Sequence, residues 1–190
     1  MARKRLFRMA VPDEAVARIF FALVPPPPLQ RALGELARDV ARRAHGRPVP
    51  AENLHATLAF VGAWPVSRQP ELHAAGAAAS GEPMQIVLDR QGAFRRAAIA
   101  WISASQPPPT LGALAQALFE RLVATGVKLD ERPFRPHVTL ARHCRGPYPS
   151  GRAGPFTWDV DALALMQSDT RAEGARYRML ASWALRDPRC

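Results

Sequence analysis

Two short segments of this chain repeat the same pair of chemically active side chains. His55-Ala56-Thr57-Leu58 recurs 82 residues later as His137-Val138-Thr139-Leu140. Successive side chains of an extended strand point to opposite faces, so the histidine and the threonine of each copy share one face. The apolar residues that alternate with them are Leu54, Ala56, Leu58 and Phe60 in the first copy, and Val138 and Leu140 in the second. Each copy therefore predicts a strand that turns an imidazole and a hydroxyl away from the core.

Two imidazoles that flank one cleft can divide the work of acid and base. The pKa of histidine lies near neutrality, so one ring can accept a proton while the other donates one. This division suits an in-line displacement at phosphorus, and each proton transfer typically accelerates such a reaction about 10²- to 10⁴-fold. The hydroxyls of Thr57 and Thr139 can donate to phosphate oxygens, and a nearby arginine can stabilise the developing charge. No metal ion is required for this scheme.

Other interpretations of the repeat stay open at this point. A single histidine on a strand is more often a surface residue than a catalyst, and threonine is a common strand former. A duplicated strand pattern without chemistry explains the apolar positions but not the retention of both histidines and both threonines. A metal site could use His137, His143 and Cys144, although their spacing matches no familiar metal-binding motif.

The elements that must position these motifs alternate between strands and helices. Periodicity predicts helices over residues 29–44, 71–80 and 111–123, and strands over residues 18–24, 54–60, 84–89, 97–103, 134–142, 158–160, 162–166 and 179–185. Thr110 is expected to cap the third helix and Gly126 to end it. A turn is expected over residues 62–65, and a Pro/Gly-rich loop over residues 146–155. Mixed helices and strands with short connections predict an α+β fold.

The length and composition indicate one folded domain, over residues 18–186, after a basic N-terminal arm at residues 1–17. The chain has 190 residues, of which 48% are hydrophobic, and this is enough for an ample core. No apolar run approaches the length of a membrane span. With only Cys144 and Cys190 no disulfide framework is expected, and the reducing cytoplasm is the expected location. We expect a monomer, since no coiled-coil pattern appears.

The net charge of +10 comes mainly from arginine. Such an excess attracts polyanions, because neutralised phosphates release their counterions. Dispersed arginines also simply solvate a surface, so the charge alone does not decide between the two interpretations. Together with the paired motifs, it favours a nucleic-acid or nucleotide phosphate as the ligand.

In their contexts the two motifs resemble the signature of the 2H phosphoesterase superfamily. The resemblance is closest to its RNA 2′,3′-cyclic phosphodiesterase branch, also called the 2′-5′ RNA ligase family. The similar segments are residues 18–24, 47–62 and 132–142, followed by Ser168, Gly174, Tyr177 and Trp183-Ala184-Leu185. The resemblance covers roughly residues 18 to 186 and implies a bilobal 2H phosphoesterase fold. That fold has two antiparallel sheets with helices outside and pseudo-two-fold symmetry around a central cleft.

The same resemblance implies hydrolysis of RNA 2′,3′-cyclic phosphate ends to 2′-phosphates, without a metal or another cofactor. His55 would protonate the leaving 3′-oxygen and His137 would activate water, although the near symmetry of the site allows these roles to be exchanged. Some members of the family also run the reverse 2′-5′ ligation. The alternatives are a non-catalytic basic RNA-binding module, a 2H enzyme acting on another cyclic phosphate, and a metal-dependent phosphodiesterase.

Three further roles follow from the resemblance. Thr57 and Thr139 would bind the phosphate, and Arg142 would assist them. Strict alternation turns Arg142 towards the core, so its role requires a bulge or a strand end before it. Phe134 would help to shape a nucleoside pocket, or would serve only as a core residue.

Overall fold

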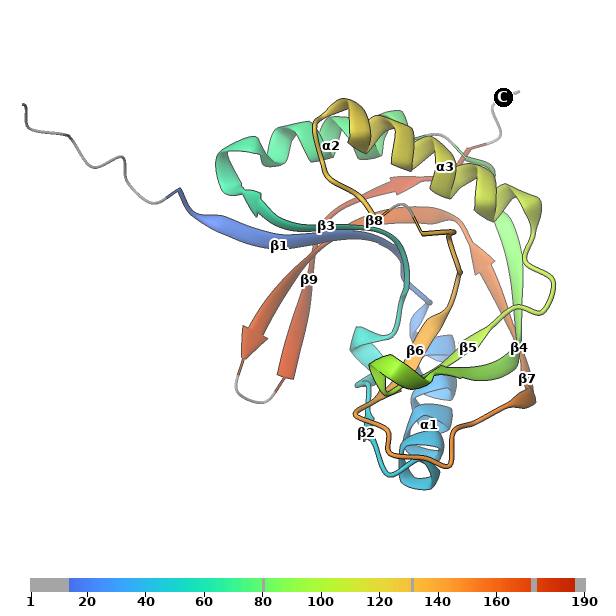
Figure 1. Cartoon of the computed structure of the whole chain (residues 1–190). Helices are drawn as coiled ribbons and strands as arrows, with labels where there is room; N and C mark the ends of the chain where they lie inside the picture. Colours follow the sequence, from blue (N-terminus) through green and yellow to red (C-terminus); the bar gives the residue numbers. More distant parts are fainter. Residues whose placement is uncertain (1–13, 80, 131, 172–173, 187–190) are drawn as a thin grey trace, which may run out of the picture.

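The computed structural model describes residues 14–79, 81–130, 132–171 and 174–186. Over these residues the chain forms three α-helices and a nine-stranded antiparallel sheet (Figure 1). The helices are α1 (Pro27–Arg43), α2 (Gln69–Ala78) and α3 (Pro109–Ala124). The strands are β1 (Val16–Leu23), β2 (Arg47–Pro48), β3 (Ala56–Pro65), β4 (Met84–Phe94), β5 (Ile99–Ser103), β6 (Val138–Arg142), β7 (Gly151–Val160), β8 (Ala162–Arg171) and β9 (Gly174–Ala184). The expected α+β class is confirmed.

The sheet consists of two halves that meet at a narrow seam. Its strand order is β7-β4-β5-β6-β3-β1-β8-β9, with β2 beside β6. At the seam between β6 and β3, the described chain pairs at one position, Ala56 with Val138. The two separate sheets implied by the family resemblance are therefore one continuous sheet. This difference arises because the middle residues of the two motifs pair with each other.

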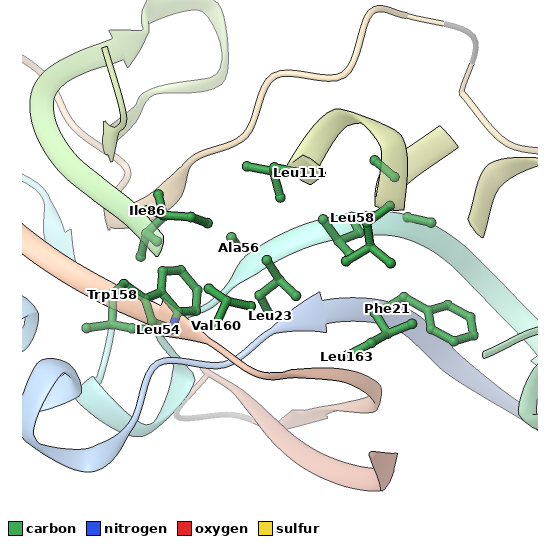
Figure 2. Packing of buried hydrophobic residues seen from close by; sticks show 14 of the residues in the cluster. Phe21, Leu23, Leu54, Ala56, Leu58, Ile86, Leu111, Trp158, Val160 and Leu163 are labelled. Atoms are coloured by element: carbon green, nitrogen blue, oxygen red, sulfur yellow. The ribbon is translucent and has the colours of Figure 1, made fainter. Parts of the chain in front are cut away.

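The helices cover the core face of the sheet, and each half receives helices of its own. Helix α1 packs against β6 and β2, whereas α2 and α3 pack on each other and on β3, β8 and β9 (Figure 1). One cluster of buried side chains spans both halves. Figure 2 shows part of it, including Leu23 of β1, Leu58 of β3 and Leu111 of α3. Burial of this apolar layer holds the two halves together across a seam with little backbone pairing.

A second, smaller cluster lies on the opposite face of the sheet. Phe20, Ala22, Ala164 and Met166 are buried there, with Tyr177 packed against them. On β1 these residues alternate with Ile19, Phe21 and Leu23, which belong to the main core. Strand β1 is therefore apolar on both faces, which explains why its sequence reads as a continuous hydrophobic run.

Several predicted boundaries are wrong, each for a physical reason. The turn expected over residues 62–65 belongs to β3, because β1 pairs with it as far as Pro65. Part of the loop expected over residues 146–155 is strand, because β4 pairs with β7 from Gly151 onward. Thr110 does not cap α3, since Pro108 is the cap residue and the Thr110 hydroxyl contacts the sulfur of Met84 instead. Gly126 follows the end of α3 with a φ of 84°, as predicted.

The predicted basic arm, residues 1–17, lies largely outside the described residues, which begin at residue 14. Strand β1 already starts at Val16, two residues before the predicted start of the domain. This extension follows from the pairing of Val16 with Pro65 at the end of β3. No helix within the described part of the chain has the length and apolar character to cross a membrane.

Candidate active site

The pairing of Ala56 with Val138 brings the two motifs side by side. In an antiparallel pair the neighbours of two opposed residues are opposed in turn, so His55 lies towards Thr139 and Thr57 towards His137. The side chains of Ala56 and Val138 enter the core, and the two are 4% and 0% exposed. The histidines and threonines therefore gather on the other face, as the repeat predicted.

Each motif contains a bulge at the same place. In the pairing of β3 with β1, Ala22 lies opposite Thr57 and Phe21 opposite Ala59, so Leu58 has no partner. In the pairing of β6 with β5, Trp101 lies opposite Thr139 and Ala100 opposite Ala141, which leaves Leu140 unpaired in the same way. A bulge adds one residue and shifts the alternation of the side chains after it. The unpaired leucine and the alanine after it are buried in both copies.

These bulges decide where the next side chain of each motif lies. Arg142 returns to the histidine face and is exposed, so the condition that the sequence set for its role is met. Its positive charge contributes to a lowered pKa at both His55 and His137. Phe60 occupies the corresponding position of the first motif and is 50% exposed. The prediction that Phe60 enters the core is therefore wrong, and the bulge at Leu58 is the reason.

The ring of His55 is held on three sides. Its Nδ1–H donates to the carbonyl oxygen of Asn53 at 2.7 Å, and a carbonyl can only accept. In the neutral ring Nε2 is therefore the acceptor, and the Thr57 hydroxyl donates to it at 3.0 Å. The ring packs against Phe20 and Tyr177, with ring centroids 4.8 and 5.1 Å away. Burial is the main cause that lowers the pKa of His55, with the charges of Arg142 and His137 adding to it.

His137 is oriented in a matching way. Its Nδ1–H donates to the carbonyl oxygen of Arg135 at 2.7 Å, so Nε2 again carries the lone pair of the neutral ring. Phe94 of β4 meets the ring edge-on at 5.0 Å. Burial lowers the pKa of His137, and the charge of Arg142 lowers it further, while the bond to Arg135 opposes this. Both imidazoles thus present Nε2 for proton transfer.

Asn53 connects the first motif to a distant hairpin. Its side-chain N–H donates to the carbonyl oxygen of Ala175 at 2.7 Å, and its own carbonyl oxygen accepts from His55. Ala175 is the second residue of β9, the strand that carries Tyr177, and the Tyr177 ring contacts the His55 ring. Asn53 is 9% exposed, and its bond to Ala175 is partly buried. Sequence reasoning gave Asn53 no role, although it lies within a segment that resembles the family.

The ring supports Phe20, Phe94 and Tyr177 were also missed as site residues. Phe20 and Tyr177 belong to the parts of the chain that resemble the family, but nothing in their residue type or spacing indicated a contact with a histidine, and Phe94 lay outside those parts. Phe134 lies in the irregular segment before β6 and is 37% exposed, so a core role for it is wrong. No ring contact between Phe134 and either histidine occurs within the described residues.

The structure does not bring together His137, His143 and Cys144, which the sequence left open as ligands of a metal ion. Among the described residues, no group of three His, Cys, Asp or Glu side chains is placed to hold a metal ion. His143 directly follows the strand that ends at Arg142, and its backbone φ is 55°. Cys144 is buried, and its backbone N–H donates to Ala98 of the turn before β5. His137, His143 and Cys144 thus form no such cluster.

Comparison with known protein sequences places the chain beside one group of enzymes. A family model described as the 2′-5′ RNA ligase superfamily matches residues 25–172. The RNA 2′,3′-cyclic phosphodiesterase of Escherichia coli (strain K12) is 31% identical over 170 residues, which make up 88% of this chain and 96% of that protein. The protein of the same name from Thermus thermophilus is 30% identical over 182 residues, or 89% and 90% of the two chains.

Solved structures agree with this sequence similarity. The crystal structure of Escherichia coli LigT complexed with 3′-AMP superposes with a TM-score of 0.83 at 29% identity, over 90% of this chain and 99% of that one. The crystal structure of TT0787 of Thermus thermophilus gives a TM-score of 0.77 at 28% identity, over the same shares of the two chains. The fold described above is therefore shared along nearly the whole length of these proteins.

Proposed function

The chain belongs to the 2′-5′ RNA ligase superfamily, and from this membership and its paired histidines we propose that it is an RNA 2′,3′-cyclic phosphodiesterase. It hydrolyses the cyclic end to a 2′-phosphate, with one histidine as acid and the other as base. The observation that carries this proposal is the pairing of Ala56 with Val138, which sets two equally oriented imidazoles on one face of the sheet. Each imidazole has its Nδ1–H on a backbone carbonyl, so Nε2 is the working nitrogen of both.

The proposed reaction is a single in-line displacement at phosphorus. A water oxygen forms a bond to phosphorus while the bond from phosphorus to the ribose 3′-oxygen breaks. The water proton passes to Nε2 of neutral His137, and Nε2–H of protonated His55 donates a proton to the departing 3′-oxygen. The product is a terminal 2′-phosphate, and a proton exchange with solvent restores both rings. We assign the acid to His55 and the base to His137 because the family resemblance assigns them so.

The groups around the histidines supply the rest of the chemistry. Thr57 and Thr139 donate hydroxyl hydrogen bonds to the non-bridging phosphate oxygens. Arg142 lies on the same face and stabilises the charge that gathers on these oxygens in the transition state. When a phosphate binds, its negative charge favours the protonated form of the acid, against the effect of burial. Phe134 shapes the nucleoside pocket in this proposal.

The partner that fits these groups is RNA that ends in a 2′,3′-cyclic phosphate. The net charge of +10 favours a polyanion over a neutral substrate, and acid–base catalysis by two histidines needs no cofactor. We propose that the protein acts as a monomer in the cytoplasm. The same acid and base would also serve the reverse 2′-5′ ligation, with an RNA hydroxyl in place of water.

The test is turnover of a short oligoribonucleotide with a 2′,3′-cyclic phosphate end, in excess chelator, with separation of 2′- from 3′-phosphate products. We expect the 2′-phosphate, and we expect at least about a 10²-fold loss in His55→Ala and in His137→Ala. RNA binding without turnover in the parent protein would instead favour the non-catalytic module. Activity that disappears with chelator would favour a metal-dependent phosphodiesterase.

A further inference from the structure

We propose that a hollow beside Trp101 is a second nucleotide subsite, which binds a nucleotide of the RNA other than the one that carries the cyclic phosphate. The hollow has a volume of about 280 Å³ and is lined by β4, by Trp101 of β5 and by the segment that precedes β7. This inference rests on the proposed function and extends it from the reacting end to the RNA chain.

The hollow adjoins the His137 side of the site. Trp101 lies directly opposite Thr139 on one side and Gly92 on the other, so all three share the face that carries the histidines. Phe94 connects the hollow with the histidine site, because its ring centroid lies 5.6 Å from that of Trp101 and 5.0 Å from that of His137. An RNA chain whose terminal phosphate is held by the histidines therefore reaches the hollow after it passes Phe94.

The walls of the hollow offer flat aromatic surfaces. The indole of Trp101 lies directly on the backbone of Gly92, where a Cβ would come within 2.2 Å of the ring. Tyr148 lines the hollow as well, and its hydroxyl donates to the carbonyl oxygen of Cys144 at 3.0 Å, which fixes the position of its ring. Stacking on rings of this kind is how proteins bind the bases of single-stranded nucleic acids without regard to sequence.

The charge of the hollow selects an anion. Arg90 and Arg95 line it, and none of its lining residues is acidic. The guanidinium of Arg95 lies over the ring of Tyr148 at 5.8 Å from its centroid. Arg152 is the direct neighbour of Arg90 on β7 but does not line the hollow, and its charge helps to lower the pKa of Asp89. A ligand that is both aromatic and anionic matches these groups, and a nucleotide within an RNA strand has both properties.

The test compares cyclic-phosphate substrates of one to five nucleotides. For the parent protein we expect kcat/KM to rise with length. In the double variant Arg90→Ala/Arg95→Ala we expect the value for the pentanucleotide to fall about tenfold or more, while the value for the mononucleotide changes less than about twofold. The matched control is Arg121→Ala, which removes an exposed arginine from α3 on the other face of the sheet and should keep the parental length dependence.

Two results would overturn the subsite. One is an unchanged length dependence in the double variant, and the other is an equal loss in Arg121→Ala, which would show that only overall charge matters. A failure of the proposed function is distinguished by binding of pentanucleotides with an ordinary 3′-hydroxyl end. If the parent turns over no cyclic phosphate, tighter binding by the parent than by the double variant still supports the subsite, and equal binding rejects it.

A second readout separates stacking from charge. We expect a bound pentanucleotide to quench part of the tryptophan fluorescence of the parent, and we expect this part to be missing in Trp101→Phe. Equal quenching in both proteins would show that no base reaches Trp101.

Discussion

Ala56 and Val138 are the middle residues of the two motifs and lie opposite each other where the halves of the sheet meet. A single backbone pair thus sets the relative position of both histidines and both threonines. The side chains of the pair are buried in the core, so the position of the reactive groups depends on apolar packing directly beneath them. Fold stability and site geometry are coupled at this point.

Val138→Ala should weaken both properties. Removing two buried carbon atoms from a fully enclosed side chain should lower the free energy of unfolding by about 2 kcal/mol. Turnover should fall as well, because β6 can then shift relative to β3. Urea denaturation and kcat measure the two effects. The control is Val123→Ala on α3, where the side chain is 49% exposed and the change should alter stability by less than about 0.5 kcal/mol.

Stability should fall in acid because of the two histidines. Burial holds the pKa of His55 and of His137 below the usual 6.5, so protonation is harder in the folded than in the unfolded chain. The stability that the two histidines contribute is therefore fully present above about pH 6.5. It is lost as the pH falls through their lower pKa values in the folded chain. Urea midpoints between pH 7.5 and 5.0 should drop less in His55→Gln/His137→Gln than in the parent. His143 is exposed, so His143→Asn should keep the parental pH dependence of the urea midpoint. The same pH dependence in the parent and in both variants would contradict the assignment of this effect to His55 and His137.

Arg142→Ala should change both the rate and its pH dependence. Loss of the guanidinium should lower kcat by about 10²- to 10³-fold, the usual effect of removing a group that stabilises charge in the transition state. Because the charge of Arg142 lowers the pKa of both histidines, its removal should move their titration to higher pH. NMR titration of the imidazole signals measures this shift. Arg142→Lys keeps the charge, so it should retain the parental titration while losing part of the rate.

Asn53→Ala should loosen the hairpin of β8 and β9 at the site. The change leaves the carbonyl oxygen of Ala175 without its donor, and we expect a loss of about 1 to 2 kcal/mol in the free energy of unfolding. Tyr177 should then hold the His55 ring less firmly, with a fall in kcat. Gln85→Ala removes a comparable but exposed amide bond to Asp159, and its effect on stability should stay near zero. A similar loss of unfolding free energy in both variants would contradict a special role of the bond between Asn53 and Ala175.

Gly92→Ala should displace Trp101. The new Cβ would lie 2.2 Å from the indole, so the ring must move at a cost of about 1 to 3 kcal/mol. Gly112→Ala is the matched change, because nothing lies within 4 Å of its Cβ position on α3. Replacing a helical glycine in open space should stabilise the protein by about 0.5 to 1 kcal/mol. Thermal unfolding of both variants tests this opposite pair of effects.

Much of the fold and the central part of the site could be predicted from local patterns. The alternation of His55 and Thr57 with apolar neighbours predicted the reactive face, and the helical spacing of Leu111 to Leu122 predicted α3. The bulges at Leu58 and Leu140 could not be predicted in this way, because they depend on the register with β1 and β5. For the same reason the positions of Phe60 and Arg142 could not be assigned until the partner strands were known.

Contacts between distant segments were also beyond local patterns. Asn53 and Ala175 are 122 residues apart, and neither residue type indicates the other. The union of the two half-sheets depends on one residue pair, which is too small a signal for periodicity to report. What the sequence did carry was the repeat itself, because the chemistry needs its imidazoles and hydroxyls at the same spacing in both copies.

The matched bulges leave one position where the two copies differ in chemistry. After each bulge a side chain returns to the histidine face, and it is Arg142 in one copy and Phe60 in the other. Phe60 also has a cation beside it, because the guanidinium of Arg18 lies over its ring, 5.6 Å from the ring centroid. A nearly symmetric site has no preference for the direction of a bound strand, yet an RNA end has a definite polarity. The exchange of arginine for an aromatic ring breaks the symmetry and provides a means to tell the two ends of the substrate apart.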